Sequence, residues 1–166
     1  MMKTPTFIYS HDSIFQGVKE ESSLFSKDKV DKDGNLLFEN LVFDEAYLSK
    51  FRGYFFDAQA EVTEAISSYL KDIPVEPEYF EFDDFSKNRD YTFFLLLPEN
   101  FTSAMIIPVN TKIRQFLIAY IMYRWLELKQ IAEYKSYQSR SENLLREVKG
   151  LLDRRNKPVR IKGRLF

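Results

Sequence analysis

The chain has 166 residues, of which 45% are hydrophobic and 16% aromatic, and it carries a formal net charge of −1. This length favours one domain with a substantial hydrophobic core. The sequence contains no cysteine, which excludes disulfides, thiolate metal sites and cysteine nucleophiles.

The charges are unevenly distributed along the chain. Residues 153–166, called the C-terminal arm below, hold six cationic side chains against Asp153, a net charge of +5. The preceding residues therefore carry −6. The near-neutral total combines an acidic body with a basic tail.

The N-terminal part is predicted to be an extended lead-in followed by a short helix. Its first segment, MMKTPTFIYSHDS, lacks the apolar run of a secretory signal peptide. From Ser10 or Ser13, apolar residues at helical spacing predict a helix that ends before residues 26–33. The apolar positions are Phe15, Val18 and Phe25.

The stretch 27–40, KDKVDKDGNLLFEN, partly matches a calcium-binding loop. With Gly34 as its sixth residue, the first and twelfth positions fall on Lys29 and Asn40, where that loop needs acidic ligands. Two aspartates inside the stretch match ligand positions of such a loop, but its first and twelfth residues do not. The sequence therefore favours a turn at Asp33-Gly34, in which glycine supplies a positive φ.

Residues 44–71 contain the most regular helical pattern in the chain. Apolar side chains recur in steps of three and four, as in a heptad seam, at Leu48, Phe51, Phe55, Ala58, Val62, Ala65 and Tyr69. We expect this helix to lie against a core. Asp44 can cap its start, and Pro74 and Pro77 are expected to end it.

Two short apolar runs at 91–97 and 102–109 flank the turn sequence Pro98-Glu99-Asn100-Phe101. This pattern predicts a β-hairpin near 91–109, with Pro108 at its end or on an edge.

The stretch before this predicted hairpin is acidic and aromatic. Its carboxylates could gather a divalent cation, but a solvated loop or strand edge is the favoured interpretation. The residues concerned are Glu81, Asp83, Asp84 and Asp90.

Residues 110–152 contain no proline and place apolar side chains every three to four positions, which predicts a long helix capped by Asn110. Such a helix would be roughly 60 Å long, against a diameter of about 40 Å for a domain of this size. The helix must therefore either project from the body of the domain or break, and the polar run 136–143 is the expected position of the break. The apolar segment 116–126 is too short for a membrane span, and Arg124 interrupts it.

Part of this long helix is predicted to pack in the core or between subunits, through Phe116, Tyr120, Arg124, Trp125 and Leu128. Trp125 is expected in the core. The alternative is an oligomer contact, because buried aromatic anchors and arginines often dominate interfaces. Both hold if the helix packs inside and then against a neighbour.

No catalytic constellation is recognisable in the sequence. The single histidine, His11, has no evident partner for general-base catalysis and no companion ligands for a metal. The five glycines are scattered, so no phosphate-binding loop is expected. The sequence therefore predicts no enzyme and no cofactor.

The C-terminal arm allows three interpretations: a disordered solubilising tail, a segment that binds phosphate backbones, or one that docks on another protein. Apolar residues interleave with its cations, which a purely electrostatic tail does not need. The alternation Val159-Arg160-Ile161-Lys162 fits an extended segment that adds to a sheet edge. Docking is favoured, through Arg154, Arg155, Lys157, Arg160, Ile161, Lys162, Arg164 and Phe166.

Three segments together resemble a known family: LVFDEAYLSKFRGYFFDAQAEV, TKIRQFLIAYIMYRWLEL and the terminal LLDRRNKPVRIKGRLF. Over residues 41–166 the chain resembles the head–tail connector (neck adaptor) proteins of tailed bacteriophages and prophages, especially those of gut Bacteroidetes. The resemblance implies a helical bundle with a small β element and a ring between portal and tail. It also implies a location in the virion and no catalysis or cofactor.

We therefore expect a mainly helical α+β domain over 1–152, with two long helices and a β-hairpin, followed by the extended basic arm. The expected partners are other copies, the portal, and tail or other neck proteins. DNA would pass through the ring without sequence-specific binding, and no membrane is involved. The alternative is a nucleic-acid-associated adaptor or regulator that uses the basic tail. It lacks a recognition helix with clustered cations.

Overall fold

The computed structural model describes residues 2–71 and 87–155. The elements in chain order are β1 (Thr6–Tyr9), α1 (His11–Ser26), α2 (Phe38–Leu41), α3 (Leu48–Ala65), β2 (Tyr91–Phe94), α4 (Ile106–Leu128) and α5 (Tyr134–Leu152). Short 3-10 turns precede α3 and α4 and follow α3. The predicted mainly helical α+β fold, with long helices and a small antiparallel β element, is confirmed.

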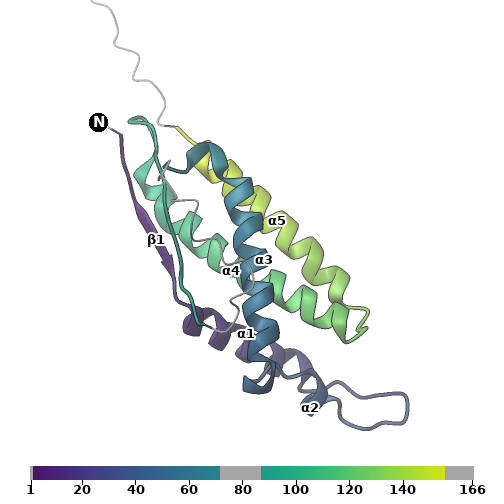
Figure 1. Ribbon diagram of the computed structural model, residues 1–166. Helices are drawn as coiled ribbons and strands as arrows, with labels where there is room; N and C mark the ends of the chain where they lie inside the picture. Colours follow the sequence, from purple (N-terminus) through teal and green to yellow (C-terminus); the bar gives the residue numbers. More distant parts are fainter. Residues whose placement is uncertain (1, 72–86, 156–166) are drawn as a thin grey trace, which may run out of the picture.

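Helix α4 is the element on which the other helices pack. It contacts α1, α3 and α5, and α3 and α5 lie alongside it in Figure 1. Its sequence is apolar nearly all round, and such a helix must be covered on several sides. Residues from β1 to α5 accordingly contribute to one continuous hydrophobic core, with Ile113, Leu117 and Ile121 fully buried.

The small sheet joins two distant segments, β1 and β2, in antiparallel register with Thr6 opposite Phe94 and Tyr9 opposite Tyr91. The predicted strand at 91–97 is therefore present, but its partner is the N-terminal segment. The predicted second strand at 102–109 is wrong: these residues form the 3-10 turn Ser103–Met105 and the start of α4. Pro108 lies in the first turn of α4, where a missing N–H costs nothing.

One face of this sheet lies on the core. Phe7 and Phe93 are buried and stack with ring centroids 5.3 Å apart, and Tyr9 stacks on Tyr91 at 6.0 Å. The opposite face carries Ile8, which is 65% exposed. The alternation in burial is the ordinary consequence of the two-residue period of a strand.

The long C-terminal helix breaks, but not within the predicted run 136–143. α4 ends at Leu128, and Gln130 adopts a positive φ of 57° before α5 begins at Tyr134. The polar run stays helical, and within it Ser141 Oγ donates to the Gln138 carbonyl at 2.7 Å. The early reversal lays the apolar face of α5 along α4. Asn110, the predicted cap, lies inside α4.

Helix α3 is shorter than the predicted 44–71. Asp44 caps the preceding 3-10 turn by accepting from Ala46 N at 3.0 Å. α3 ends at Ala65, and Lys71 N then donates to the Phe94 carbonyl at 2.8 Å. The chain leaves the helix early because the free edge of β2 supplies backbone partners.

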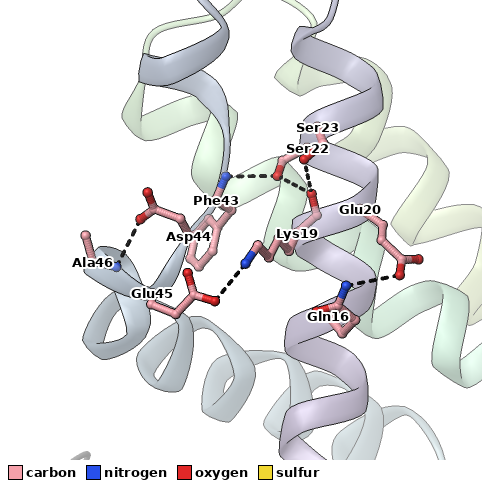
Figure 2. Close-up of polar contacts among 9 residues, drawn as sticks. All are labelled: Gln16, Lys19, Glu20, Ser22, Ser23, Phe43, Asp44, Glu45 and Ala46. Carbon is pink, nitrogen blue, oxygen red and sulfur yellow. Dashed lines mark hydrogen bonds and ion pairs between the residues drawn. The ribbon is translucent and has the colours of Figure 1, made fainter.

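The first helix and the loop after it form as expected. Ser10 caps α1, and Gly34 occupies the turn with a φ of 83°. The connection to α3 is fixed on α1, as Figure 2 shows: Phe43 N donates to Ser22 Oγ at 2.9 Å, and Ser22 Oγ donates to the Lys19 carbonyl at 3.0 Å. Lys19 also pairs with Glu45 at 2.7 Å.

Candidate interaction surfaces

Trp125, predicted as a core residue or a subunit contact, is fully buried within this chain. Its Nε1 donates to the Leu41 carbonyl at 2.7 Å, and its ring meets Phe43 with centroids 4.7 Å apart. Lys129 Nζ lies 4.5 Å from the ring centroid and closes the outer side. Every polar atom of this side chain is therefore used inside the chain.

The other predicted packing residues of α4 divide between interior and surface. Phe116 is 2% exposed, whereas Leu128 is 49% exposed and available to a neighbour. Arg124 Nη1 lies 3.3 Å from Asp57 Oδ2 of α3 and donates to Tyr120 Oη at 3.2 Å. Burial raises the pKa of the Tyr120 phenol, although Arg124 opposes that rise. Arg124 thus holds α4 to α3.

A groove opens beside this arginine, where α3, α4 and α5 meet. It encloses a cavity of about 210 Å³. Aromatic rings from α4 line it together with side chains from α3 and α5, of which Glu61 and Glu142 are exposed and are called its rim below. The lining residues are Glu61, Phe116, Tyr120, Tyr123, Gln138, Ser141, Glu142 and Leu145.

The rim of this groove is acidic. Glu61 and Glu142 are exposed, and within residues 2–71 and 87–155 neither forms an ion pair. Nearby acids do have partners, since Glu147 pairs with Lys112 and Asp57 pairs with Arg124. The groove therefore combines aromatic faces with two exposed carboxylates that form no ion pair with another described residue.

The C-terminal arm begins at the end of the bundle where α3 and α5 finish and α4 starts. Tyr69 donates a hydrogen bond to Asp153 Oδ1, and Arg154 Nη1 lies 3.8 Å from Met105 Sδ. Arg155 forms an isolated antiparallel bridge with Phe101. The remaining predicted docking residues lie outside the described part of the chain: Lys157, Arg160, Ile161, Lys162, Arg164 and Phe166.

His11 is buried, although its sequence surroundings are polar. It is 2% exposed and meets the Phe51 ring edge-on at 4.9 Å. Its Nδ1 lies 3.0 Å from Asp12 Oδ1, and Nε2 has no partner among the described residues. His11 N donates to Asp90 Oδ1 at 2.8 Å, so this acid orients the start of α1.

Most of the predicted acidic cluster lies outside the described residues, because Glu81, Asp83 and Asp84 fall in 72–86. Within the described ranges, no three potential ligands gather in a way that could hold a metal ion. No helix there is long and apolar enough to cross a membrane.

Sequence reasoning did not find the groove. Its lining combines single residues of α3 with turns of α4 and α5 that meet only because the chain reverses at Gln130. The sequence held one indication of it, the pair Tyr120 and Tyr123. These two aromatic residues lie on a helix that already has enough apolar residues to cover its core-facing side. The carboxylates that lie opposite these rings can be identified only when the position of the chain reversal between α4 and α5 is known.

Comparisons with known proteins do not add to this geometry. A scan of protein-family models, a search of curated proteins and a search of solved structures each found no match to the chain.

Proposed function

We propose that this protein is a virion structural protein, a head–tail connector (neck adaptor) that assembles as a ring between the portal and the tail of a bacteriophage or prophage. The observation that carries the proposal is the root of the C-terminal arm. Asp153, Arg154 and Arg155 are held against the end of a helical body, so the cationic residues that follow start from a fixed point. A basic segment rooted on an acidic body is suited to joining like copies or a partner.

Assembly would draw its free energy from apolar burial between copies. Exposed apolar side chains that could contribute are Ile8 on the outer sheet face and Leu128 at the end of α4. An acidic channel wall would repel DNA phosphates and let the duplex slide without sequence-specific contacts. The ring would form in the bacterial cytoplasm and remain in the virion, in contact with the portal and with tail or other neck proteins.

The test is light scattering on the purified protein, alone and mixed with the portal protein encoded near its gene. The full chain is compared with a shortened chain whose last residue is Arg155. Residues 153–155 are kept because they contact the body and their removal would disturb the fold. We expect a ring or a stable portal complex with the full chain, and loss of that complex with the shortened chain.

Two results would overturn the proposal. One is a portal complex of equal stability with both chains. The other is no association under any condition, together with duplex DNA binding that falls steeply with salt and is lost on shortening. The second outcome would support the nucleic-acid adaptor.

A further inference from the structure

The groove among α3, α4 and α5 has the chemistry of a site for cationic, partly apolar peptide. Tyr120 and Tyr123 offer aromatic faces, which attract guanidinium and ammonium groups. Glu61 and Glu142 stand on the rim without ion-pair partners in the described ranges. Leu145 adds apolar surface that can cover the aliphatic stems of lysine and arginine.

The chain itself contains a segment of the matching composition. Residues 156–166, NKPVRIKGRLF, hold four cationic side chains and no acidic one. In an extended segment successive side chains point to opposite sides. Bound in that form, Val159 and Ile161 would share one side, while Arg160 and Lys162 would share the other. Apolar side chains could lie on the rings while the cations reach the rim carboxylates.

The arm starts at the end of the bundle, away from the groove. At Arg155 the backbone is bridged to Phe101 at the end of the bundle, whereas the groove opens on its side, between α3 and α5. Eleven further residues can extend up to about 36 Å, which reaches the groove of the same chain as well as that of an adjacent copy. The proposed ring assembly selects the adjacent copy. The basic arm and the acidic rim are complementary in charge, so such an approach is favoured.

We propose that the groove lined by Glu61, Tyr120, Tyr123 and Glu142 binds residues 156–166 of a second copy of this chain. The two contacting surfaces are different, so the contact is heterologous. A heterologous contact repeated from copy to copy closes into a ring when its rotation permits. This inference rests on the proposed assembly function and specifies which surface receives the arm.

The absence of cysteine from the chain allows a direct test of this contact by disulfide trapping. One full-length protein carries Gln138→Cys in the groove, and another carries Leu165→Cys in the arm. Mixed under mild oxidation, the two are expected to form a disulfide-linked heterodimer faster than either forms a homodimer. The same two substitutions in one chain, at low concentration, should give little intramolecular disulfide.

A second set of variants tests the role of charge. Neutralising the rim with Glu61→Gln and Glu142→Gln should slow heterodimer trapping at least about fivefold, since each exposed pair contributes modestly. High salt should slow trapping by the unmodified groove. The matched control, Asp28→Asn with Glu39→Gln, removes two exposed acids between α1 and α3 and should leave trapping unchanged.

Three outcomes would overturn the inference. They are the absence of heterodimer trapping, equal trapping by the rim and control variants, and a disulfide formed mainly within one chain. The light-scattering test with the portal protein is independent of these results. A portal complex that survives neutralisation of the rim would remove the groove assignment and leave the connector function in place.

Discussion

Helix α4 has two aromatic regions whose polar atoms are used differently. Around Trp125 the indole N–H is bonded to the Leu41 carbonyl, and Phe43 and Lys129 cover the ring. Around Tyr123, less than one helical turn away in sequence, the rings line a cavity whose rim carries Glu61 and Glu142. The first region is closed within the chain, and the second is open.

The difference separates residues that maintain the fold from residues that remain available to a partner. A buried polar group that has a partner contributes to stability, and removing the partner costs free energy. An exposed carboxylate without a partner contributes little until another molecule supplies one. Substitutions in the closed region should therefore reduce stability, whereas those in the open region should affect association alone.

The largest effect is expected from Trp125→Ala in the closed region. It removes a fully buried ring and leaves the Leu41 carbonyl unpaired, so the free energy of unfolding should fall by about 3–5 kcal/mol. Urea denaturation measures this change. The matched variant Tyr123→Ala, from the half-buried ring of the groove, should lose less than about 1 kcal/mol. Equal losses would contradict the division.

Ser22→Ala should lower the free energy of unfolding by about 1–3 kcal/mol, because it leaves the buried Phe43 N–H without its acceptor. Ser23→Ala is the control. Among the described residues its hydroxyl bonds only to the Lys19 carbonyl of its own helix, so its loss should be under about 0.5 kcal/mol. Indistinguishable denaturation curves for the two variants would show that Ser22 does not fix the connection between α1 and α3.

Stability should also fall at alkaline pH, through tyrosines of the buried sheet face. Burial raises the pKa of Tyr91 to about 12, and burial and the neighbouring Tyr91 raise the pKa of Tyr9. Because an unfolded tyrosine ionises near pH 10, the neutral forms stabilise the fold fully below that pH. This stabilisation is lost as pH rises towards the folded pKa.

The expected slope is about 1.4 kcal/mol per pH unit for each such tyrosine above pH 10. Denaturant unfolding at increasing pH measures it, with phenolate absorbance as a second readout. Tyr91→Phe should make the slope shallower. A slope that this substitution does not change would place the titrating groups elsewhere.

The smallest stability effect is expected at the open groove. The double variant Glu61→Gln, Glu142→Gln should change the free energy of unfolding by less than about 0.5 kcal/mol, because both side chains are exposed and unpaired within the described ranges. Thermal unfolding of the isolated protein measures this. A larger loss would mean that these carboxylates support the fold, and they would then belong with the closed region.

Much of the helical content was predictable because it depends on local patterns. The cap at Ser10, the seam through Phe51 and Val62, and the turn at Gly34 each follow from a few neighbouring residues. The part of α4 from residue 110 was equally clear, since 110–128 is a long apolar segment without proline.

The errors concern features that depend on distant segments. The partner of β2 lies at the N-terminus, and no local pattern distinguishes Thr6–Tyr9 from 102–109 as the second strand. The reversal at Gln130 requires a positive φ at a residue type that gives no signal for it. The groove depends on that reversal, so its acidic rim could not be assigned from sequence. The burial of His11 likewise depends on Phe51, a residue from another helix.

The pairing of β1 with β2 also determines when the fold can close as the chain is made. Phe7 lies opposite Phe93, so the first strand leaves the ribosome 86 residues before its partner. At synthesis rates of about 5–20 residues per second, this delay is roughly 4–17 s. During that time Phe7 and Tyr9 have no strand to cover them, and α4 has not yet been made. A nascent chain interrupted before residue 91 would leave these aromatic side chains open to chaperones and proteases.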